Sequence, residues 1–165
     1  MTGVQTCALP ILSLDVETVG AKLTGMAMHV EKATGRKADR FLVQQMVPGG
    51  VELILGFRRD PLGTAILLGM GGVTAELFND TALRMLQAER PLSREDALGM
   101  AMELRTWPLL DGYRGRAKSD VDALVSAIVA FSQMACALGE RLIEAEINPL
   151  FVLPQGQGEI GRAHV

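Results

Sequence analysis

The chain has 165 residues, of which 48% are hydrophobic and 21% charged, and its formal net charge at pH 7 is -3. This length and composition fit one globular domain that can bury a core of its own. The small negative charge gives no electrostatic reason to expect a nucleic acid or an anionic membrane as a partner, and no stretch approaches the ~20 uninterrupted apolar residues that span a bilayer.

The two ends of the chain differ in character from the middle. Residues 1–11, M-T-G-V-Q-T-C-A-L-P-I, resemble the in-frame translation of a short-read sequencing adapter, and residues 159–165, E-I-G-R-A-H-V, resemble the translation of its reverse complement. We therefore expect residues 12–158 to be the natural sequence, cut from a longer gene, and both flanking segments to lie outside the core. Cys136 is then the sole natural cysteine, which agrees with a cytoplasmic location.

The first elements are a helix and two strands. Residues 15–33 read as an amphipathic helix, weakened by two glycines and ended by Gly35. Residues 41–47 and 51–58 are rich in β-formers, and Pro48-Gly49-Gly50 between them is typical of a compact turn. The pattern predicts that these two runs pair as an antiparallel hairpin.

Strands and helices then follow without strict alternation. Residues 65–70 read as a strand, and Gly71-Gly72 leads into another over residues 73–78. Ser93-Arg94-Glu95-Asp96 resembles a capping box, which predicts a helix running to Trp107-Pro108.

A longer helix is predicted to begin at Ser119. Its apolar residues recur at helical spacing: Val121, Leu124, Ile128, Phe131, Ala135 and Leu138. Residues 142–148 form a strand, and residues 150–153 continue it or start another after Pro149. This order of elements favours a layered α+β (mixed α/β) domain.

Three oxygen-bearing side chains stand at alternate positions just before Pro149. Glu144, Glu146 and Asn148 would share one face of a strand, because successive side chains point to opposite faces. Two carboxylates and an amide oxygen are hard ligands suited to Mg2+. The alternative is an ordinary edge strand with a solvated acidic face.

Several segments in a fixed order carry a family resemblance. They are Leu42-Val43-Gln44-Gln45-Met46-Val47-Pro48-Gly49-Gly50-Val51-Glu52-Leu53-Ile54-Leu55-Gly56, Asp60-Pro61, Gly69-Met70-Gly71-Gly72, Asp111-Gly112-Tyr113-Arg114-Gly115 and Glu146-Ile147-Asn148-Pro149-Leu150. Together they closely resemble the ATP-grasp domain of NDP-forming acyl-CoA synthetases, which include ADP-forming acetate-CoA ligases and, more distantly, the β subunit of succinyl-CoA synthetase. The resemblance implies an incomplete ATP-grasp-like fold with a central, mainly antiparallel sheet flanked by helices.

The resemblance also implies a site for ATP or ADP. Gln45, Met46 and Val47, with Gln44 just before them, match the hinge whose backbone meets the adenine edge. Glu52 matches a glutamate that faces the nucleotide near the ribose. The alternative for the hinge segment is a plain hairpin, and the alternative for Glu52 is an exposed glutamate without a ligand.

For the metal, the resemblance implies that Asn148 is one Mg2+ ligand, with Glu146 beside it. The family's other carboxylate ligand would fall in the adapter-like tail, and its phosphate-contacting lysine would lie upstream of residue 12. We therefore expect the fragment to bind Mg-ATP weakly and to be inactive alone. Arg114 also matches a family position, and the alternative for it is a solvated loop arginine.

The activity implied for the parent protein is that of an NDP-forming acid-CoA ligase. Acid, CoA and ATP would be interconverted with acyl-CoA, ADP and phosphate, through a phosphorylated histidine on a missing domain. The partners would be the CoA-binding and CoA-ligase domains of the parent. The alternative is a nucleotide-sensing regulatory domain of a bacterial protein acetyltransferase.

Overall fold

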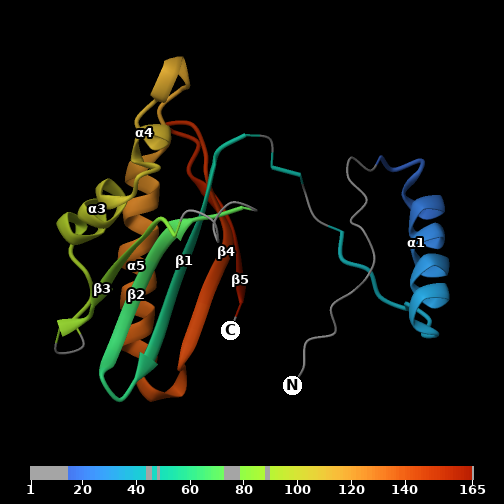
Figure 1. The fold of residues 1–165 in the computed structure, drawn as a ribbon, viewed down its shortest axis with the longest axis horizontal. Coiled ribbons are helices and arrows are strands. Elements are labelled where there is room, and N and C mark those ends of the chain that lie inside the picture. The colour runs from blue at the N-terminus through green and yellow to red at the C-terminus, as the bar shows by residue number, and fades with distance from the viewer. Residues whose placement is uncertain (1–14, 44–45, 48, 73–78, 88–89, 165) are drawn as a thin grey trace. The chain divides into compact units, whose positions relative to one another are not determined.

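The computed structural model describes residues 15–43, 46–47, 49–72, 79–87 and 90–164 (Figure 1). The chain consists of two compact units, Met1–Pro48 and Gly49–Val165.

The first unit contains one described helix, α1 (Val19–Thr34). It ends as predicted at Gly35, which adopts a left-handed conformation with φ 69° and donates its N–H to the carbonyl oxygen of Glu31. No residue of α1 is buried. The described residues after it, 36–43 and 46–47, form neither helix nor strand.

The second unit is built on a five-stranded antiparallel sheet with the order β3-β2-β1-β4-β5 (Figure 1). The strands are β1 (Val51–Asp60), β2 (Gly63–Met70), β3 (Thr81–Met85), β4 (Glu144–Val152) and β5 (Glu159–His164). The predicted antiparallel sheet is therefore confirmed.

The predicted pairing of the first hairpin is wrong. Strand β1 pairs with β2 on one side and with β4 on the other, so its neighbours come after it in the chain. The hairpin turn is instead the one between β1 and β2. In this turn the Asp60 carboxylate accepts the N–H of Leu62 at 2.8 Å, and Gly63 has φ 130°. The predicted strand at 65–70 is confirmed as β2, whereas residues 73–78 lie outside the described part of the chain.

The capping box at Ser93 is confirmed and opens α3 (Arg94–Glu103). The prediction that this helix runs to Trp107 is wrong, because the chain turns after Glu103. The buried Asp80 carboxylate accepts the N–H groups of Arg105 at 2.7 Å and Thr106 at 2.9 Å, which holds that turn. Trp107 instead begins the short helix α4 (Trp107–Leu110), where a proline is tolerated because the first turn has no N–H partner to lose.

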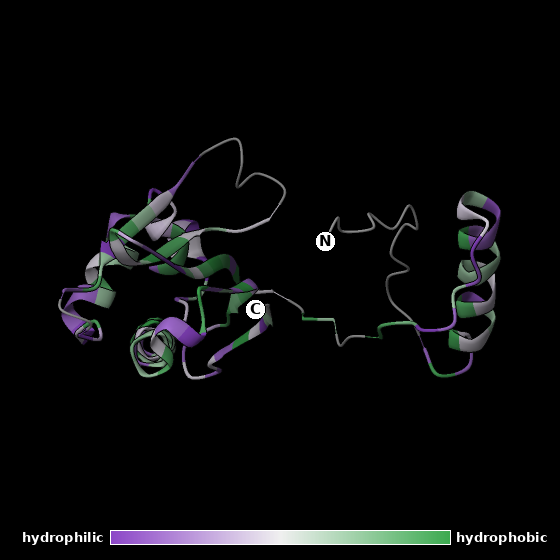
Figure 2. Cartoon of the chain, turned by 90° about the horizontal axis from the view of Figure 1, so that it is seen from below, coloured by the Kyte–Doolittle hydropathy of each residue, from purple (hydrophilic) through white to green (hydrophobic). Residues whose placement is uncertain are grey.

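Helix α5 (Val121–Leu138) packs its apolar stripe against one face of the sheet, and Figure 2 shows it end-on beneath the strands. Its buried residues are Leu124, Val125, Ile128, Phe131, Ser132 and Ala135. The ring of Phe131 meets that of Phe57 from β1 edge-to-face at 5.5 Å. By length and composition alone, the segment 121–141 is apolar enough to cross a membrane, but its packing against the sheet is that of a core helix.

Strand β4 runs through Pro149 to Val152, so of the two alternatives left open by the sequence, the one in which the strand continues is confirmed. Ile147 pairs with Leu55 and Leu150 with Leu53, so Asn148 and Pro149 together face the single residue Ile54. Such a bulge adds a residue to one strand and bends it.

Strand β5 forms one edge of the sheet, and its residues 159–163 are exposed. The Asp120 carboxylate holds the turn before β5 by accepting the N–H groups of Gly156 and Gly158, both at 2.9 Å. The same side chain accepts the N–H of Ala123 at 3.1 Å and caps α5.

Candidate functional site

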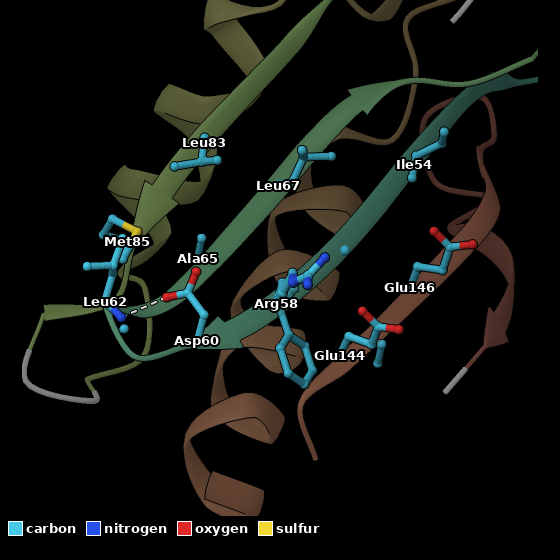
Figure 3. A pocket seen from close by; sticks show the side chains of 14 residues that line it. Ile54, Arg58, Asp60, Leu62, Ala65, Leu67, Leu83, Met85, Glu144 and Glu146 are labelled. Atoms are coloured by element: carbon cyan, nitrogen blue, oxygen red, sulfur yellow. Dashed lines mark hydrogen bonds between the residues drawn. The ribbon is translucent and has the colours of Figure 1, made fainter. Parts of the chain in front are cut away.

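Within the described residues of the second unit, the face of the sheet opposite α5 is uncovered and forms a cavity of about 730 Å³ (Figure 3). On β1, Leu53, Leu55 and Phe57 point into the core, so the residues between them belong to the open face. A cavity of this size falls within the ~300–1,000 Å³ typical of small-molecule sites.

One half of the cavity is apolar. Leu67 of β2 lies opposite Leu83 of β3, and Ala65 lies opposite Met85. Leu62, Leu83 and Met85 are 88%, 52% and 45% exposed. Exposed large apolar side chains gathered in a hollow are typical of a surface that receives a ligand or a partner.

The other half of the cavity carries charge. Glu144 and Glu146 project from β4 beside Arg58 of β1, as Figure 3 shows. Glu144 pairs with Arg58 in the strand register, and Glu146 pairs with Gly56. Because Gly56 has no side chain, the space beside the Glu146 carboxylate is open.

The alternation along β4 puts Glu144 and Glu146 on the open face and Ala145 in the core. This is the arrangement expected from their spacing, while their role as metal ligands stays a prediction. Among the described residues, no three Asp, Glu, His or Cys side chains gather into a metal site by themselves. A site for a divalent cation here would therefore depend on oxygen donors of another kind, such as the Asn148 amide.

Asn148 lies at the bulge of β4, opposite Ile54. Glu52 is two residues from Ile54 on β1, or about 7 Å along the strand. The structure thus places Asn148 in the middle of β4 and Glu52 near the start of the neighbouring strand β1. Nucleotide contact by either residue stays a prediction.

The glycine pair after β2 approaches Glu52 closely. The N–H of Gly71 donates to the carbonyl oxygen of Glu52 at 2.8 Å, and a Cβ on Gly71 would lie 2.8 Å from the Glu52 Cγ. Gly72 has φ 79°, which favours glycine. A residue with a side chain at position 71 would therefore clash with Glu52. The sequence alone did not indicate this constraint.

The predicted hinge residues are only partly visible. Gln44 and Gln45 lie outside the described residues, whereas Met46 and Val47 are described as part of the first unit. Met46 is 56% exposed. Adenine binding at this segment stays a prediction.

Arg114, singled out by its motif, has a left-handed backbone with φ 52°, and its guanidinium lies 5.3 Å from the centre of the Tyr113 ring. This backbone region is uncommon for a residue with a side chain. Arg114 thus stacks on the neighbouring Tyr113 ring in a loop. This geometry by itself gives no indication of a small-molecule ligand for Arg114.

Comparison with known proteins finds relatives that are similar to this chain in sequence and in fold. The profile of the ATP-grasp domain family matches residues 11–159. The β subunits of ADP-forming acetate-CoA ligases II and I from Pyrococcus furiosus are 32% and 37% identical over 120 and 111 residues, which are 72% and 67% of this chain. The chain spans only 49% and 46% of those two subunits.

Solved structures of related proteins have a similar fold. A crystal structure of a protein from Pyrococcus horikoshii Ot3 matches with a TM-score of 0.74 and 28% identity, covering 89% of this chain and 61% of its own. An acetyl-coenzyme A synthetase from Ca. Korarchaeum cryptofilum, in complex with coenzyme A and Mg-AMPPCP, matches with a TM-score of 0.68 and 29% identity, covering 94% of this chain and 74% of its own. The chain therefore belongs to the ATP-grasp domain family and is a homologue of part of the ADP-forming acetate-CoA ligases.

Proposed function

We propose that the parent protein is an ADP-forming acid-CoA ligase and that this chain supplies part of its nucleotide-binding domain. The reaction would interconvert acid, CoA and ATP with acyl-CoA, ADP and phosphate. The similar ligases of Pyrococcus furiosus and Archaeoglobus fulgidus support this proposal. The acid, and the choice between adenine and guanine nucleotides, stay open.

The chain would act on the nucleotide side of a phosphoryl relay. A phosphohistidine on another domain of the parent would carry the phosphoryl group, and the Korarchaeum structure with its phosphohistidine segment pointing towards the nucleotide-binding site supports that division. The CoA-binding and CoA-ligase domains would thus be the partners of this domain. Catalysis here would rest on positioning and charge stabilisation.

The open face of the sheet is where we place the nucleotide. Glu146 and Asn148 would hold Mg2+, and their carboxylate and amide oxygens are the donors that this ion prefers. The bound ion would offset the charge of the phosphates. Glu52 would face the ribose, and the backbone of residues 45–47 would face the adenine. The observation that carries the proposal is the exposed Glu146 carboxylate, set opposite Gly56 in a cavity of nucleotide size.

Titration calorimetry on the full-length parent with ADP, with and without Mg2+, tests this placement. Glu146→Gln is expected to weaken Mg-ADP binding by at least about tenfold, the effect of losing one charge-assisted contact, and to leave metal-free ADP binding unchanged. Glu140→Gln is the matched control, because Glu140 is exposed and lies outside the cavity lining. Equal effects of the two substitutions would refute the assignment.

The alternative, a nucleotide-sensing domain of a protein acetyltransferase, has no support from these relatives.

We also propose that residues 12–158 are the natural segment and that residues 1–11 and 159–165 derive from adapter. The family match to residues 11–159 supports these bounds. A cytoplasmic location of the parent is also proposed, because its similar relatives are acid-CoA ligases.

A further inference from the structure

The loop of residues 111–118, D-G-Y-R-G-R-A-K, follows α4 and has no role in the proposed nucleotide site. Figure 1 shows the chain after α4 projecting at the top of the second unit. The N–H of Ser119 donates to the carbonyl oxygen of Leu110 at 2.8 Å, which closes the base of the loop. The Lys118 ammonium lies 2.7 Å from the Asp111 carboxylate and closes it a second time. Closed surface loops of this kind frequently carry function.

The tip of the loop holds an arginine in a backbone conformation that suits glycine. Arg114 has φ 52° and ψ 41°. Gly112 and Gly115 beside it also have positive φ, 93° and 81°. Positive φ is uncommon for a residue with a side chain, so an arginine here costs free energy that a third glycine would not. A residue held in such a conformation at an exposed tip indicates that its side chain has a use.

The side chains of Tyr113 and Arg114 face solvent together. Tyr113 is 48% exposed, and Arg114 is exposed and stacks on its ring. The Arg114 guanidinium makes no hydrogen bond or ion pair with a described residue. The stacking therefore restrains the guanidinium while its N–H donors are left to water.

The loop is a positive patch on a chain whose net charge is -3. It carries three cations, Arg114, Arg116 and Lys118, and one carboxylate, that of Asp111, which already pairs with Lys118. Arg116 is also exposed and forms no ion pair with a described residue. Two guanidiniums thus lack a counter-charge in the described part of the chain, and the group that a guanidinium binds best is a carboxylate or a phosphate.

The shape of the loop favours a carboxylate on a protein surface. Sites for small ligands are concave and bury most of the ligand, whereas Tyr113 and Arg114 stand on a projection. Tyrosine and arginine are also enriched among the residues that dominate protein–protein contacts. The chain spans about half of the similar Pyrococcus furiosus subunits, so under the proposed function the rest of the parent supplies such a surface.

We propose that the loop of residues 111–118 is a docking element, in which Tyr113 and Arg114 anchor a carboxylate-bearing surface of another domain of the parent. This inference rests on the proposed function, because it needs a parent with further domains. Arg114 binds the carboxylate through paired N–H donors, and the Tyr113 ring packs beside it. Neither residue lines the cavity of the open face, so docking leaves nucleotide binding there unchanged.

Arginine modification by phenylglyoxal, followed by mass spectrometry, tests the contact in this chain and in the full-length parent. Arg114 is expected to react at least about tenfold more slowly in the parent, the protection that one charge-assisted contact gives. Arg90 is the matched control, because it is exposed and lies between β3 and α3, outside the loop. Equal reactivity of Arg114 in the two proteins overturns the proposal, and so does equal slowing of Arg90 and Arg114.

Substitutions in the parent separate docking from nucleotide binding. Arg114→Gln is expected to slow acyl-CoA formation about tenfold and to leave Mg-ADP binding unchanged, whereas Arg90→Gln changes neither. If Arg114→Gln weakens Mg-ADP binding as much as it slows the reaction, the loop binds a nucleotide phosphate and docking is refuted. If the wild-type parent binds no Mg-ADP, the proposed function is overturned, while slow modification of Arg114 still supports docking.

Arg114→Gly separates docking from a structural role of the arginine. Because the backbone at this position suits glycine, the variant is expected to unfold in urea at the same or a higher midpoint than the wild type and still to lose the ligase rate. A lower midpoint together with an unchanged rate per folded protein would show that Arg114 only supports the fold, and would overturn the proposal.

Discussion

Replacing Gly71 by alanine tests the close approach of the chain after β2 to Glu52. The added Cβ would lie 2.8 Å from the Glu52 Cγ and 3.1 Å from the carbonyl carbon and oxygen of the same residue. The Cγ belongs to a flexible side chain and can move. The carbonyl group belongs to the central strand β1, which the β2 and β4 ladders hold on both sides, so it cannot move freely.

The expected effect is a loss of stability. Forcing an extra methyl into a packed position costs ~1–3 kcal/mol, and reduced freedom of the unfolded chain returns ~0.4–1 kcal/mol. We therefore expect Gly71→Ala to lower the free energy of unfolding by roughly 1–2 kcal/mol. Urea unfolding followed by the fluorescence of Trp107, the single tryptophan, reports on this unit.

Gly99→Ala is the matched control for this substitution. Gly99 lies inside α3, and a Cβ there would meet only the Arg84 side chain, at 3.8 Å. Because alanine is the better helix former, this variant is expected to be more stable by ~0.5–1 kcal/mol. If Gly71→Ala is as stable as the wild type with an unchanged denaturant slope, the described contact with β1 is wrong.

Two further predictions concern α5. The pKa of Asp120 is lowered because its carboxylate accepts the N–H groups of Gly158, Ala123 and Gly156. Its folded-state pKa is therefore below the unfolded value, so its contribution to stability is present above the unfolded pKa and is lost as the pH falls through the folded pKa. Asp120→Asn is expected to lower the urea midpoint at pH 7 and to differ less from the wild type in acid, whereas a constant difference would contradict this. Ile128→Ala, at a fully buried position, is expected to cost ~2–5 kcal/mol in the same assay, and a cost below ~1 kcal/mol would mean that α5 does not pack as described.

Elements with local signals were predictable from sequence. The capping box at Ser93, the glycine stop at Gly35 and the apolar stripe of α5 each depend on residues within a turn or two. The period of two along β4 likewise placed Glu144 and Glu146 on one face.

Strand pairing was harder to predict because the choice of partner is not local. Pro48-Gly49-Gly50 and Asp60-Pro61-Leu62-Gly63 are both turn signals, and only the second closes a hairpin. The contact between β1 and β4 joins residues far apart in the chain, so nothing near β1 indicated that Gly56 would stand opposite Glu146. The apolar half of the cavity was missed for the same reason, since Leu67 and Leu83 read as ordinary strand residues until their shared face is known.

The alternation along β1 also bears on how such a domain can diverge. One set of its side chains, Leu53, Leu55 and Phe57, belongs to the core. The interleaved residues Ile54, Gly56 and Arg58 line the cavity of the open face. Point substitutions in the second set can change ligand preference and leave the buried core of the sheet untouched. An insertion or deletion of one residue has no such freedom, because it exchanges the two sets and turns charged groups toward α5. Homologues that differ in nucleotide preference should therefore vary at the interleaved positions of this strand while keeping its length.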